Sequence, residues 1–256
     1  DYPDIDDTAA IGMALDRSGD PANREAVERA AEWILGLQSR NGGWGAFDAD
    51  NTKHYLNHIP FADHGALLDP PTADVTARCV GFLAQLGHGA EHPALARALD
   101  YLRREQEPDG SWFGRWGTNY VYGTWSVLSA LNAVGVPHHA PEVQRAVAWL
   151  LERQQPDGGW GEDGATYWAE RKAEVKASTP SQTAWALMAL MAAGQVDHPA
   201  VERGVRFLLA HPRDGAAWQE PWHTAVGFPR VFYLRYHGYR HYFPLWALAR
   251  YRNLIG

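Results

Sequence analysis

Residues 142–160, EVQRAVAWLLERQQPDGGW, decide the fold, because they hold one complete unit of a helix followed by a turn. Apolar side chains recur at helical spacing and give the helix one apolar face, through Val143, Ala146, Val147, Leu150 and Leu151. The Pro-Asp-Gly turn that follows is a strong helix stop. Within the unit, Trp149 stands 11 positions and Gln154 stands 6 positions before Trp160.

The same unit occurs four times along the chain. The aromatic pairs at this spacing are Trp33 with Trp44, Tyr101 with Trp112, Trp149 with Trp160, and Phe207 with Trp218. A glutamine stands at the same position in three copies, as Gln38, Gln106 and Gln154. In the fourth copy Pro212 occupies the glutamine position. Self-similarity of this kind indicates a repeat architecture.

A threonine precedes each of the four tryptophans at a nearly constant spacing. Thr8, Thr76, Thr124 and Thr183 precede the four tryptophans by 36, 36, 36 and 35 residues. Each threonine begins a segment rich in small and apolar residues, as in WALMALMAAG at 185–194. A helix that is apolar on most sides is buried by its neighbours. Each repeat is therefore predicted to pair a buried inner helix with an amphipathic outer helix.

We predict an all-α fold, an α/α toroid of inner and outer helices, with residues 1–256 as one catalytic-type domain. Alternating β-branched runs are few. Two-helix repeats either stack as an open solenoid or close into a ring. A ring is favoured because an open array would leave one face of the apolar helices in water. A last helix is predicted through residues 244–249.

Composition excludes several classes of function. The formal net charge is -7, which gives no electrostatic reason to propose nucleic acid binding. No apolar run approaches the roughly 18 residues of a membrane span, and no signal peptide is visible. Cys79 is the only cysteine, which fits a reducing compartment and excludes a disulfide within the chain. The 12 tryptophans call for a repeated packing device or an aromatic-lined cavity.

Long connections between repeats tend to be functional. The segment 219–242, QEPWHTAVGFPRVFYLRYHGYRHY, is too aromatic for a solvated loop. Phe228 and Phe232 are four residues apart and could share one face. These rings either pack in the core or form a wall that stabilises a cationic substrate.

Three carboxylates crowd the start of the first apolar helix, in Asp4-Ile5-Asp6-Asp7-Thr8. Capping explains them in one way, because Asp is a preferred N-cap residue and the helix dipole stabilises negative charge in the first turn. Acid chemistry explains them in another way. Crowded carboxylates in a dry cavity cannot all ionise, so one of them stays protonated and can donate a strong proton.

These residues together resemble the squalene-hopene cyclases and, more broadly, the class II triterpene cyclases. The glutamine-to-tryptophan repeats are similar to the QW motifs of that family, and residues 4–8 are similar to its DxDDT acid motif. The segments GRWGTNYVYGT at 114–124 and GFPRVFYLRYHGY at 227–239 also match. Protein prenyltransferase β-subunits form similar helical toroids, so the combination of motifs, more than the repeats alone, carries the resemblance.

The resemblance implies proton-initiated cyclisation of squalene or a shorter polyprenyl through carbocation intermediates. Asp6 would donate the proton, and Asp4 and Asp7 would polarise and orient it. Asp74 and Tyr122 match the polar network that restores the proton. The matching aromatic residues along the substrate are Trp116, Phe228, Phe232, Tyr236 and Tyr239, with Phe61 at a constriction of the access channel.

Three departures from the family pattern affect this expectation. Phe47 stands where some members have a tyrosine, and it keeps an aromatic face without a hydroxyl. Arg78 stands where a histidine can pair with the acid motif, and we expect its charge to hold Asp4 or Asp7 ionised while Asp6 stays the neutral acid. The third departure is length, because full-length members have a second helical domain and further helices before the acid motif. The resemblance therefore implies an incomplete α6-α6 barrel.

The resemblance implies neither a metal nor another cofactor. A zinc site of the prenyltransferase kind needs Cys, His and a carboxylate, and Cys79 has no carboxylate two residues away. His54, His58 and His64 fall in one loop, but their spacing matches no zinc pattern.

The family is a membrane-attached homodimer, which implies a cytoplasmic protein attached peripherally to the cytoplasmic membrane. A second copy or a partner chain would complete the barrel. A rival interpretation keeps the repeats without the chemistry, so that the chain is a non-catalytic or split-enzyme helical toroid with a structural or binding role. In that case the carboxylates at residues 4–7 only cap a helix.

Overall fold

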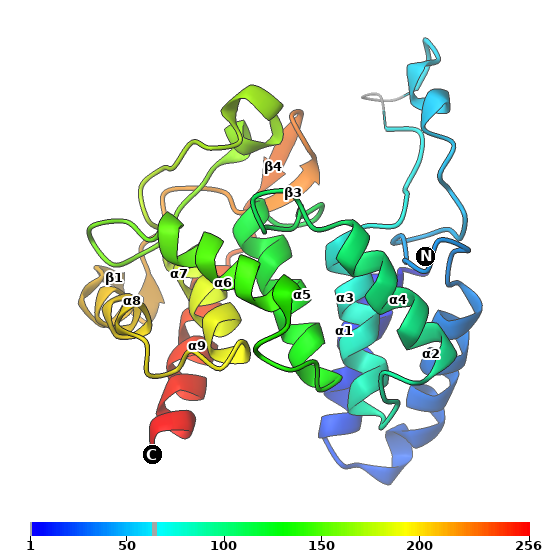
Figure 1. Ribbon diagram of the computed structural model, residues 1–256, viewed down its shortest axis with the longest axis horizontal. Coiled ribbons are helices and arrows are strands. Elements are labelled where there is room, and N and C mark those ends of the chain that lie inside the picture. Colours follow the sequence, from blue (N-terminus) through cyan, green and yellow to red (C-terminus); the bar gives the residue numbers. More distant parts are fainter. Residues whose placement is uncertain (1, 63–65) are drawn as a thin grey trace. The chain divides into compact units, whose positions relative to one another are not determined.

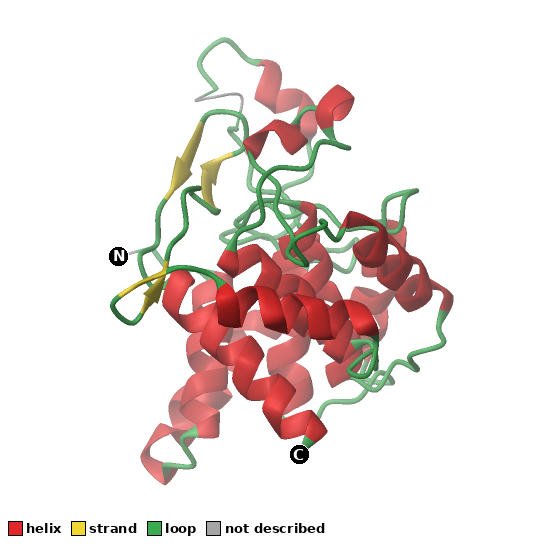
Figure 2. Ribbon diagram, turned by 90° about the vertical axis from the view of Figure 1, so that its left-hand side faces the viewer, coloured by secondary structure: helices red, strands yellow, loops and turns green. Residues whose placement is uncertain are grey.

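The computed structural model describes residues 2–62 and 66–256 (Figure 1). Its helices are α1 Ile5–Arg17, α2 Arg24–Gly36, α3 Ala73–Gln85, α4 Pro93–Arg104, α5 Tyr120–Ala133, α6 Pro141–Arg153, α7 Pro180–Ala192, α8 Pro199–Ala210 and α9 Tyr239–Ile255. Short 3-10 helices are η1 Pro21–Asn23, η2 His54–His58, η4 Gly164–Tyr167 and η5 Ala169–Arg171. The strands are β1 Arg213–Asp214, β2 Ala217–Trp218, β3 Ala225–Phe228 and β4 Phe232–Leu234. Helices dominate the described chain (Figure 2), which confirms the all-α prediction.

The chain forms two compact units. The first holds Asp1–Glu105 with Ala130–Val136, and the second holds Gln106–Ser129 with Pro137–Gly256. In the first unit α1 packs against α2 and α3, and α3 packs against α4. In the second unit α7 packs against α6, α8 and α9. The assignment of residues 1–256 to one domain stays a prediction.

The inner and outer helices differ in burial as the sequence predicts. Every residue of α7 is buried, whereas α8 buries one face through Ala200, Val201, Gly204, Val205 and Leu208. Burying a Leu or Val side chain fully stabilises a fold by about 1.5–3 kcal/mol, so the inner helices form the core of each repeat. None of the described helices is both long enough and apolar enough to cross a membrane.

Each glutamine-tryptophan turn ties one repeat to the next. The side-chain Nε2 of Gln154 donates to the carbonyl oxygens of Gly158 and Ala200, at 2.8 Å each. The backbone N–H of Trp160 donates to Oγ1 of Thr183 at 3.0 Å. Ala200 lies in the first turn of the next outer helix, and Thr183 lies in the next inner helix. One turn therefore holds both helices of the repeat that follows.

The other two connections between repeats, called joints below, contain the same hydrogen bonds. The glutamine side chain donates to a backbone carbonyl, from Gln38 to Ala94 and from Gln106 to Glu142. The tryptophan N–H donates to a threonine, from Trp44 to Thr76 and from Trp112 to Thr124. Thr76, Thr124 and Thr183 recur in phase with the tryptophans because each of them accepts the backbone N–H of the preceding tryptophan. An arginine of the following outer helix also donates to each glutamine, from Arg97, Arg145 and Arg203.

Glycine is required inside these turns. Gly158 has a φ of +89°, a conformation that side chains with a Cβ rarely adopt. A Cβ there would lie 2.7 Å from the carbonyl oxygen of Arg203. Gly42 and Gly110 meet the carbonyls of the matching arginines in the same way. The turn can approach the next outer helix closely only because it lacks a side chain.

The aromatic segment after Trp218 differs from expectation in its secondary structure. Phe228 and Phe232 lie opposite each other in the antiparallel hairpin of β3 and β4, with ring centroids 5.5 Å apart. They therefore share one face as a cross-strand pair. The shared face was predicted, but its interpretation as helical spacing was wrong. The last helix, α9, begins at Tyr239, before the predicted range of 244–249.

Candidate active site

The acid motif forms the first turn of α1. Asp4 is the N-cap of this helix, because its backbone is extended and its Oδ1 accepts the backbone N–H of Asp7 at 2.7 Å. Burial raises the pKa of Asp4 above its ordinary value, although the hydrogen bond from Asp7 lowers it. Asp7 itself is exposed. Capping is thus the observed structural role of Asp4, and it leaves the side chain of Asp6 available for another contact.

Asp6 contacts a cation from another helix. Nε of Arg78, on α3, lies 3.1 Å from Oδ1 of Asp6. The side chains of Asp6 and Arg78 are 24% and 22% exposed, so the pair is largely withdrawn from water but still reached by it. Arg78 was expected to hold Asp4 or Asp7 ionised and to leave Asp6 as a neutral acid. The expected partner was wrong, because the guanidinium contacts the Asp6 carboxyl itself, and the role of Asp6 as the acid stays a prediction.

Helix α3 also carries the predicted support for the acid. Asp74 and Arg78 stand four residues apart on α3, so their side chains leave the same face of the helix. Asp74 is 3% exposed. Tyr101, which the sequence interpretation did not select, donates its hydroxyl to the carbonyl of Pro71 at 2.8 Å. Burial raises the pKa of the Tyr101 hydroxyl, and the charges of Glu105 and Asp74 raise it further.

The segment after the first tryptophan turn lies against the start of α1. The backbone N–H of Ile5 donates to the carbonyl of Ala46 at 2.7 Å. Phe47 follows directly, and its ring meets that of Tyr2 edge to face, with centroids 5.6 Å apart. The structure therefore places Phe47 beside the acid motif. Phe61 is 82% exposed, and its place at a constriction of the access channel stays a prediction.

Three predicted aromatic residues come together in the second unit. The backbone N–H of Val226 donates to the carbonyl of Trp116 at 3.1 Å, which joins the loop before α5 to strand β3. Arg115 lies over the ring of Trp116, 4.2 Å from its centroid, and 5.6 Å from that of Phe228. Phe232 pairs with Phe228. A cation thus already rests against these ring faces.

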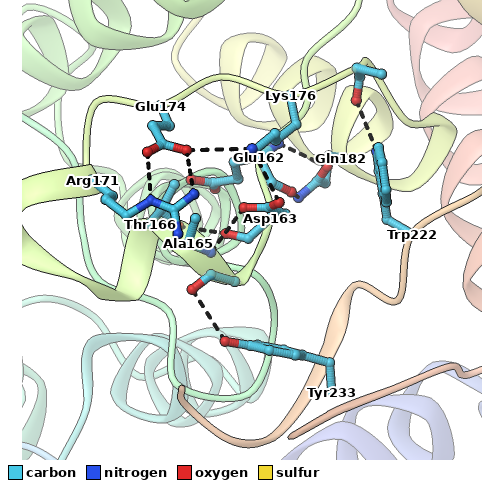
Figure 3. A network of polar contacts seen from close by, with 12 residues as sticks. Glu162, Asp163, Ala165, Thr166, Arg171, Glu174, Lys176, Gln182, Trp222 and Tyr233 are labelled. Atoms are coloured by element: carbon cyan, nitrogen blue, oxygen red, sulfur yellow. Dashed lines mark hydrogen bonds and ion pairs between the residues drawn. The ribbon is translucent and has the colours of Figure 1, made fainter. Parts of the chain in front are cut away.

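Glu162 and Gln182 belong to a polar network (Figure 3). Glu162 also fixes the start of α5, the helix that carries Tyr122. Glu162 accepts the backbone N–H groups of Asn119 and Val121, at 2.9 and 2.6 Å. Gln182 of α7 donates to the carbonyl of Glu162 at 2.7 Å. Burial raises the pKa of the Glu162 carboxyl, although the two backbone donors lower it. This carboxylate acts as a cap that holds the first turn of α5 in place.

Tyr122 belongs to a cluster of aromatic rings from the inner helices. Its ring meets Trp185 edge to face at 5.0 Å, and Trp185 stacks on Trp125 at 6.1 Å. Phe243 contacts both tryptophans, at 5.3 and 5.4 Å. Tyr239 contacts Phe243 at 4.9 Å.

The sequence interpretation missed Trp125, Trp185 and Phe243. Trp125 directly follows Thr124, and Trp185 stands two residues after Thr183. The threonine phase could therefore have located both tryptophans. Tyr236 is 54% exposed and contacts Tyr239 at 5.2 Å. Tyr122 and the aromatic residues of this cluster belong to the second unit, so their approach to Asp6 stays a prediction.

Two other features bear on ligands. Within residues 2–62 and 66–256 no three His, Cys, Asp or Glu side chains are grouped to hold a metal ion, and His64 lies outside these residues. A hollow of about 870 Å³ lies among α1, α2 and the end of α3, lined by Leu15, Val27, Leu35 and Gln85 among others. The residues that line it do not include the acid motif.

Comparison with known proteins identifies the family of the chain. Residues 1–253 match the squalene-hopene cyclase C-terminal domain. Squalene-hopene cyclases of Bradyrhizobium diazoefficiens and Alicyclobacillus acidocaldarius are 59% and 53% identical to this chain over 99% of its length. The chain spans only 39% and 41% of the length of these two relatives.

A solved structure shows the same fold. A variant of the type II terpene cyclase MstE from Scytonema, in complex with geranylgeranyl dihydroxybenzoate, covers 98% of this chain with a TM-score of 0.70 and 18% identity. The matched region is 74% of that protein. At this identity the likeness concerns the fold, whereas the sequence matches establish the relationship. The chain therefore belongs to the squalene-hopene cyclase C-terminal domain family.

Proposed function

We propose that this chain supplies the proton donor of a class II terpene cyclase, with Asp6 as the acid. The ion pair between Asp6 and Arg78 is the observation that carries the proposal. Arg78 donates to Oδ1 of Asp6 and so leaves the second carboxyl oxygen for a proton. Asp6 and Arg78 are 72 positions apart in the sequence and lie on α1 and α3, so the packing of these two helices holds the ion pair in place.

The reaction needs an acid that gives its proton to an alkene. When the proton leaves, an Asp6 carboxylate remains next to the Arg78 guanidinium, which stabilises the new negative charge. The alkene carbon takes the proton, and a carbocation forms on the neighbouring carbon. Asp74, one turn from Arg78 on α3, and Tyr122 would return a proton to Asp6 after the reaction.

The carbocation then needs a surface that offers neither a base nor a nucleophile. Aromatic ring faces attract cations, at about 2 kcal/mol or more when water is excluded. Trp116, Phe228 and Phe232 would form such a surface in the second unit, and the position of the Arg115 guanidinium over the rings of Trp116 and Phe228 supports this role. Tyr236, Tyr239 and Phe47 would extend this wall, and Phe61 would lie along the path of the substrate.

The substrate class follows from this chemistry. An apolar polyprenyl such as squalene, or a shorter one, offers the terminal alkene that Asp6 protonates. The relatives bear the name squalene-hopene cyclase, which supports squalene as the first substrate to test. We further propose a cytoplasmic protein in peripheral contact with the membrane, in which a second copy or a partner chain closes the barrel around the substrate.

Product analysis tests the proposal. The purified chain is incubated in detergent with squalene, farnesol or geranylgeraniol, and extracts are analysed by gas chromatography with mass spectrometry. We expect cyclic products from the parent chain and none from Asp6→Asn, with unchanged helical circular dichroism. Asp16→Asn, at the other end of α1, serves as the matched control and should keep full activity. Cyclisation by Asp6→Asn at the parent rate would exclude Asp6 as the donor.

A second candidate function is supported by the N-cap. Asp4 caps α1, and Asp6 keeps 24% exposure, as expected of carboxylates that serve a helical scaffold. In that case the chain is a structural or split-enzyme toroid without chemistry of its own. The same assay separates the two functions, because a folded parent chain that forms no product from any of the three substrates supports the scaffold.

A further inference from the structure

Arg115 lies against two of the aromatic rings that are proposed to face the substrate. Its guanidinium carbon is 4.2 Å from the centroid of the Trp116 ring and 5.6 Å from that of the Phe228 ring. Nη1 of Arg115 also donates to the carbonyl oxygen of Gly227 at 2.9 Å. One planar group thus connects the loop before α5 to strand β3, 112 positions along the chain.

The hydrogen bond to Gly227 continues a backbone ladder. Residues 116–118 pair with residues 224–226 through backbone hydrogen bonds of 2.9 and 3.1 Å. Because this pairing is antiparallel, the next rung would join residue 115 to residue 227. The side chain of Arg115 supplies a donor at this position, since its Nη1 donates to the Gly227 carbonyl. Arg115 therefore holds the end of the ladder from which the rings of Trp116 and Phe228 project.

The same rung reaches Phe232. The ring of Phe232 lies over Gly227 and leaves no room there for a Cβ. Phe232 also pairs with Phe228 across the hairpin, with ring centroids 5.5 Å apart. A shift of the Gly227 backbone would therefore move Phe232, and Phe228 with it.

Packing alone does not hold these rings. Trp116 and Phe228 are half-buried, and Phe232 is 41% exposed. By contrast, Trp125 and Trp185 of the inner helices are 4% and 0% exposed, and close packing on all sides fixes such rings. A ring with an open face can rotate unless another group restrains it. Arginine suits this task, because its planar group can stack on an aromatic ring and donate hydrogen bonds at the same time.

We propose that Arg115 is a positioning residue that holds Trp116, Phe228 and Phe232 as one wall and thereby limits which products form. This inference rests on the proposed cyclisation. The carbocation beside the wall has two outcomes. The electron pair of the next alkene closes another ring and moves the charge along the chain, or an adjacent C–H bond gives its proton to water and leaves an alkene. Rings held in one position stabilise one carbocation geometry, whereas loose rings stabilise several.

Fluorine NMR tests the positioning without any substrate. The chain is labelled with 4-fluorophenylalanine at its 8 phenylalanines. The signals of Phe228 and Phe232 are assigned from their loss in Phe228→Leu and Phe232→Leu. We expect Arg115→Ala to shift or broaden both signals, with unchanged helical circular dichroism. Unchanged signals of both residues in Arg115→Ala would overturn the proposal.

Two further variants separate the planar group from its charge and from general effects of a lost arginine. Arg115→Lys keeps the charge without the planar group, so we expect it to change both signals as well, and it replaces Arg115→Ala if that variant does not fold. Parent-like signals in Arg115→Lys would overturn the positioning role. Arg153→Ala is the matched control and should leave both signals unchanged. Arg153 also lies over a tryptophan ring, 5.5 Å from the centroid of Trp149, and donates to the carbonyl of Ala173 at 2.8 Å.

The distribution of products tests the effect on the reaction. Parent and variant chains are incubated with squalene, and the products are separated by gas chromatography. We expect the ratio of minor to main product to rise about threefold or more in Arg115→Ala and Arg115→Lys, the effect of one lost hydrogen bond, and to keep the parent value in Arg153→Ala. An unchanged ratio in both Arg115 variants would overturn the inference, whereas cyclic product from the parent would still support the proposed function. If the parent forms no product, the proposed function fails and the fluorine signals alone decide the role of Arg115.

Discussion

Arg78 changes what the acid motif can do. The sequence predicts a permanent cation near three carboxylates. In the structure Nε of Arg78 lies 3.1 Å from Oδ1 of Asp6. Arginine stays protonated at all physiological pH values, so its support for the Asp6 carboxylate does not switch with pH. A histidine at this position would behave differently, because its ordinary pKa lies near 6.5.

Replacing Arg78 by histidine should therefore make cyclisation depend on pH. Below its pKa the imidazolium supports Asp6, and above it the neutral ring does not. We expect the initial rate of squalene cyclisation by Arg78→His to fall between about pH 6 and 8, while the parent rate changes little over the same range. Parallel pH profiles of the two proteins would show that the charge at residue 78 does not act on the acid.

Glu162 allows a separate prediction about stability. Burial raises the pKa of this carboxyl above its ordinary value of 4.5, so the folded protein binds the proton more tightly than the unfolded chain does. The contribution of Glu162 to stability is therefore largest at low pH and decreases as pH rises from about 4.5 through the raised pKa.

Glu162→Gln removes this titration and keeps an oxygen that can accept from Asn119 and Val121. We expect the free energy of unfolding of Glu162→Gln, relative to the parent, to increase with pH over that window. Urea unfolding at pH 4, 5, 6 and 7 measures the difference. A difference that stays constant across these pH values would contradict the raised pKa.

The paired helices could be predicted from the sequence because the hydrogen bonds that connect them recur in every repeat. Each connection between repeats uses the same glutamine, glycine, tryptophan, threonine and arginine. These residues therefore recur at a fixed spacing, and that spacing allowed the helix pairs to be predicted. The β3–β4 hairpin lies outside the repeated pattern, so no periodic spacing predicted it. Its two phenylalanines stand four residues apart because a short turn separates them, and that spacing also fits a helix.

The glycine turns can be tested as elements. Gly158→Ala would force a positive φ on alanine and bring a Cβ within 2.7 Å of the Arg203 carbonyl, so we expect a loss of more than about 2 kcal/mol. Gly215→Ala is the matched control. Gly215 also has a positive φ, +61°, but nothing lies within 4 Å of its Cβ position.

Gly215→Ala should cost only the conformational part, about 1 kcal/mol. Urea unfolding compares the two variants, and equal losses would show that the close approach to α8 adds nothing to the conformational cost. The comparison thus separates the packing of the joint from the strain of its backbone.

At the scale of the whole molecule, the site could be predicted only in part. The family resemblance selected Asp6, Asp74 and the aromatic residues, since their motifs are local in sequence. The partner of Arg78 could not be selected, because the carboxylates of residues 4–7 lie within one helical turn and only the packing of α3 on α1 distinguishes them.

The surface of the molecule gives a further prediction. Tyr242, Leu245 and Trp246 stand at helical spacing on α9 and are all exposed, which forms an apolar stripe. We expect Leu245→Lys to reduce self-association of the chain, as measured by static light scattering, without loss of helical circular dichroism. Asn253→Lys adds the same charge at a polar exposed position of α9. A similar reduction by both variants would attribute the effect to net charge and not to the stripe.

Cys79 has a practical consequence for spectroscopy. It is the only cysteine of the chain, it is fully buried in α3, and burial raises its pKa well above the ordinary value. Because the thiolate is the reactive form, maleimide and methanethiosulfonate reagents find almost no native target in the folded protein. A cysteine introduced at any exposed position can therefore carry a single fluorophore or nitroxide without replacement of a native residue.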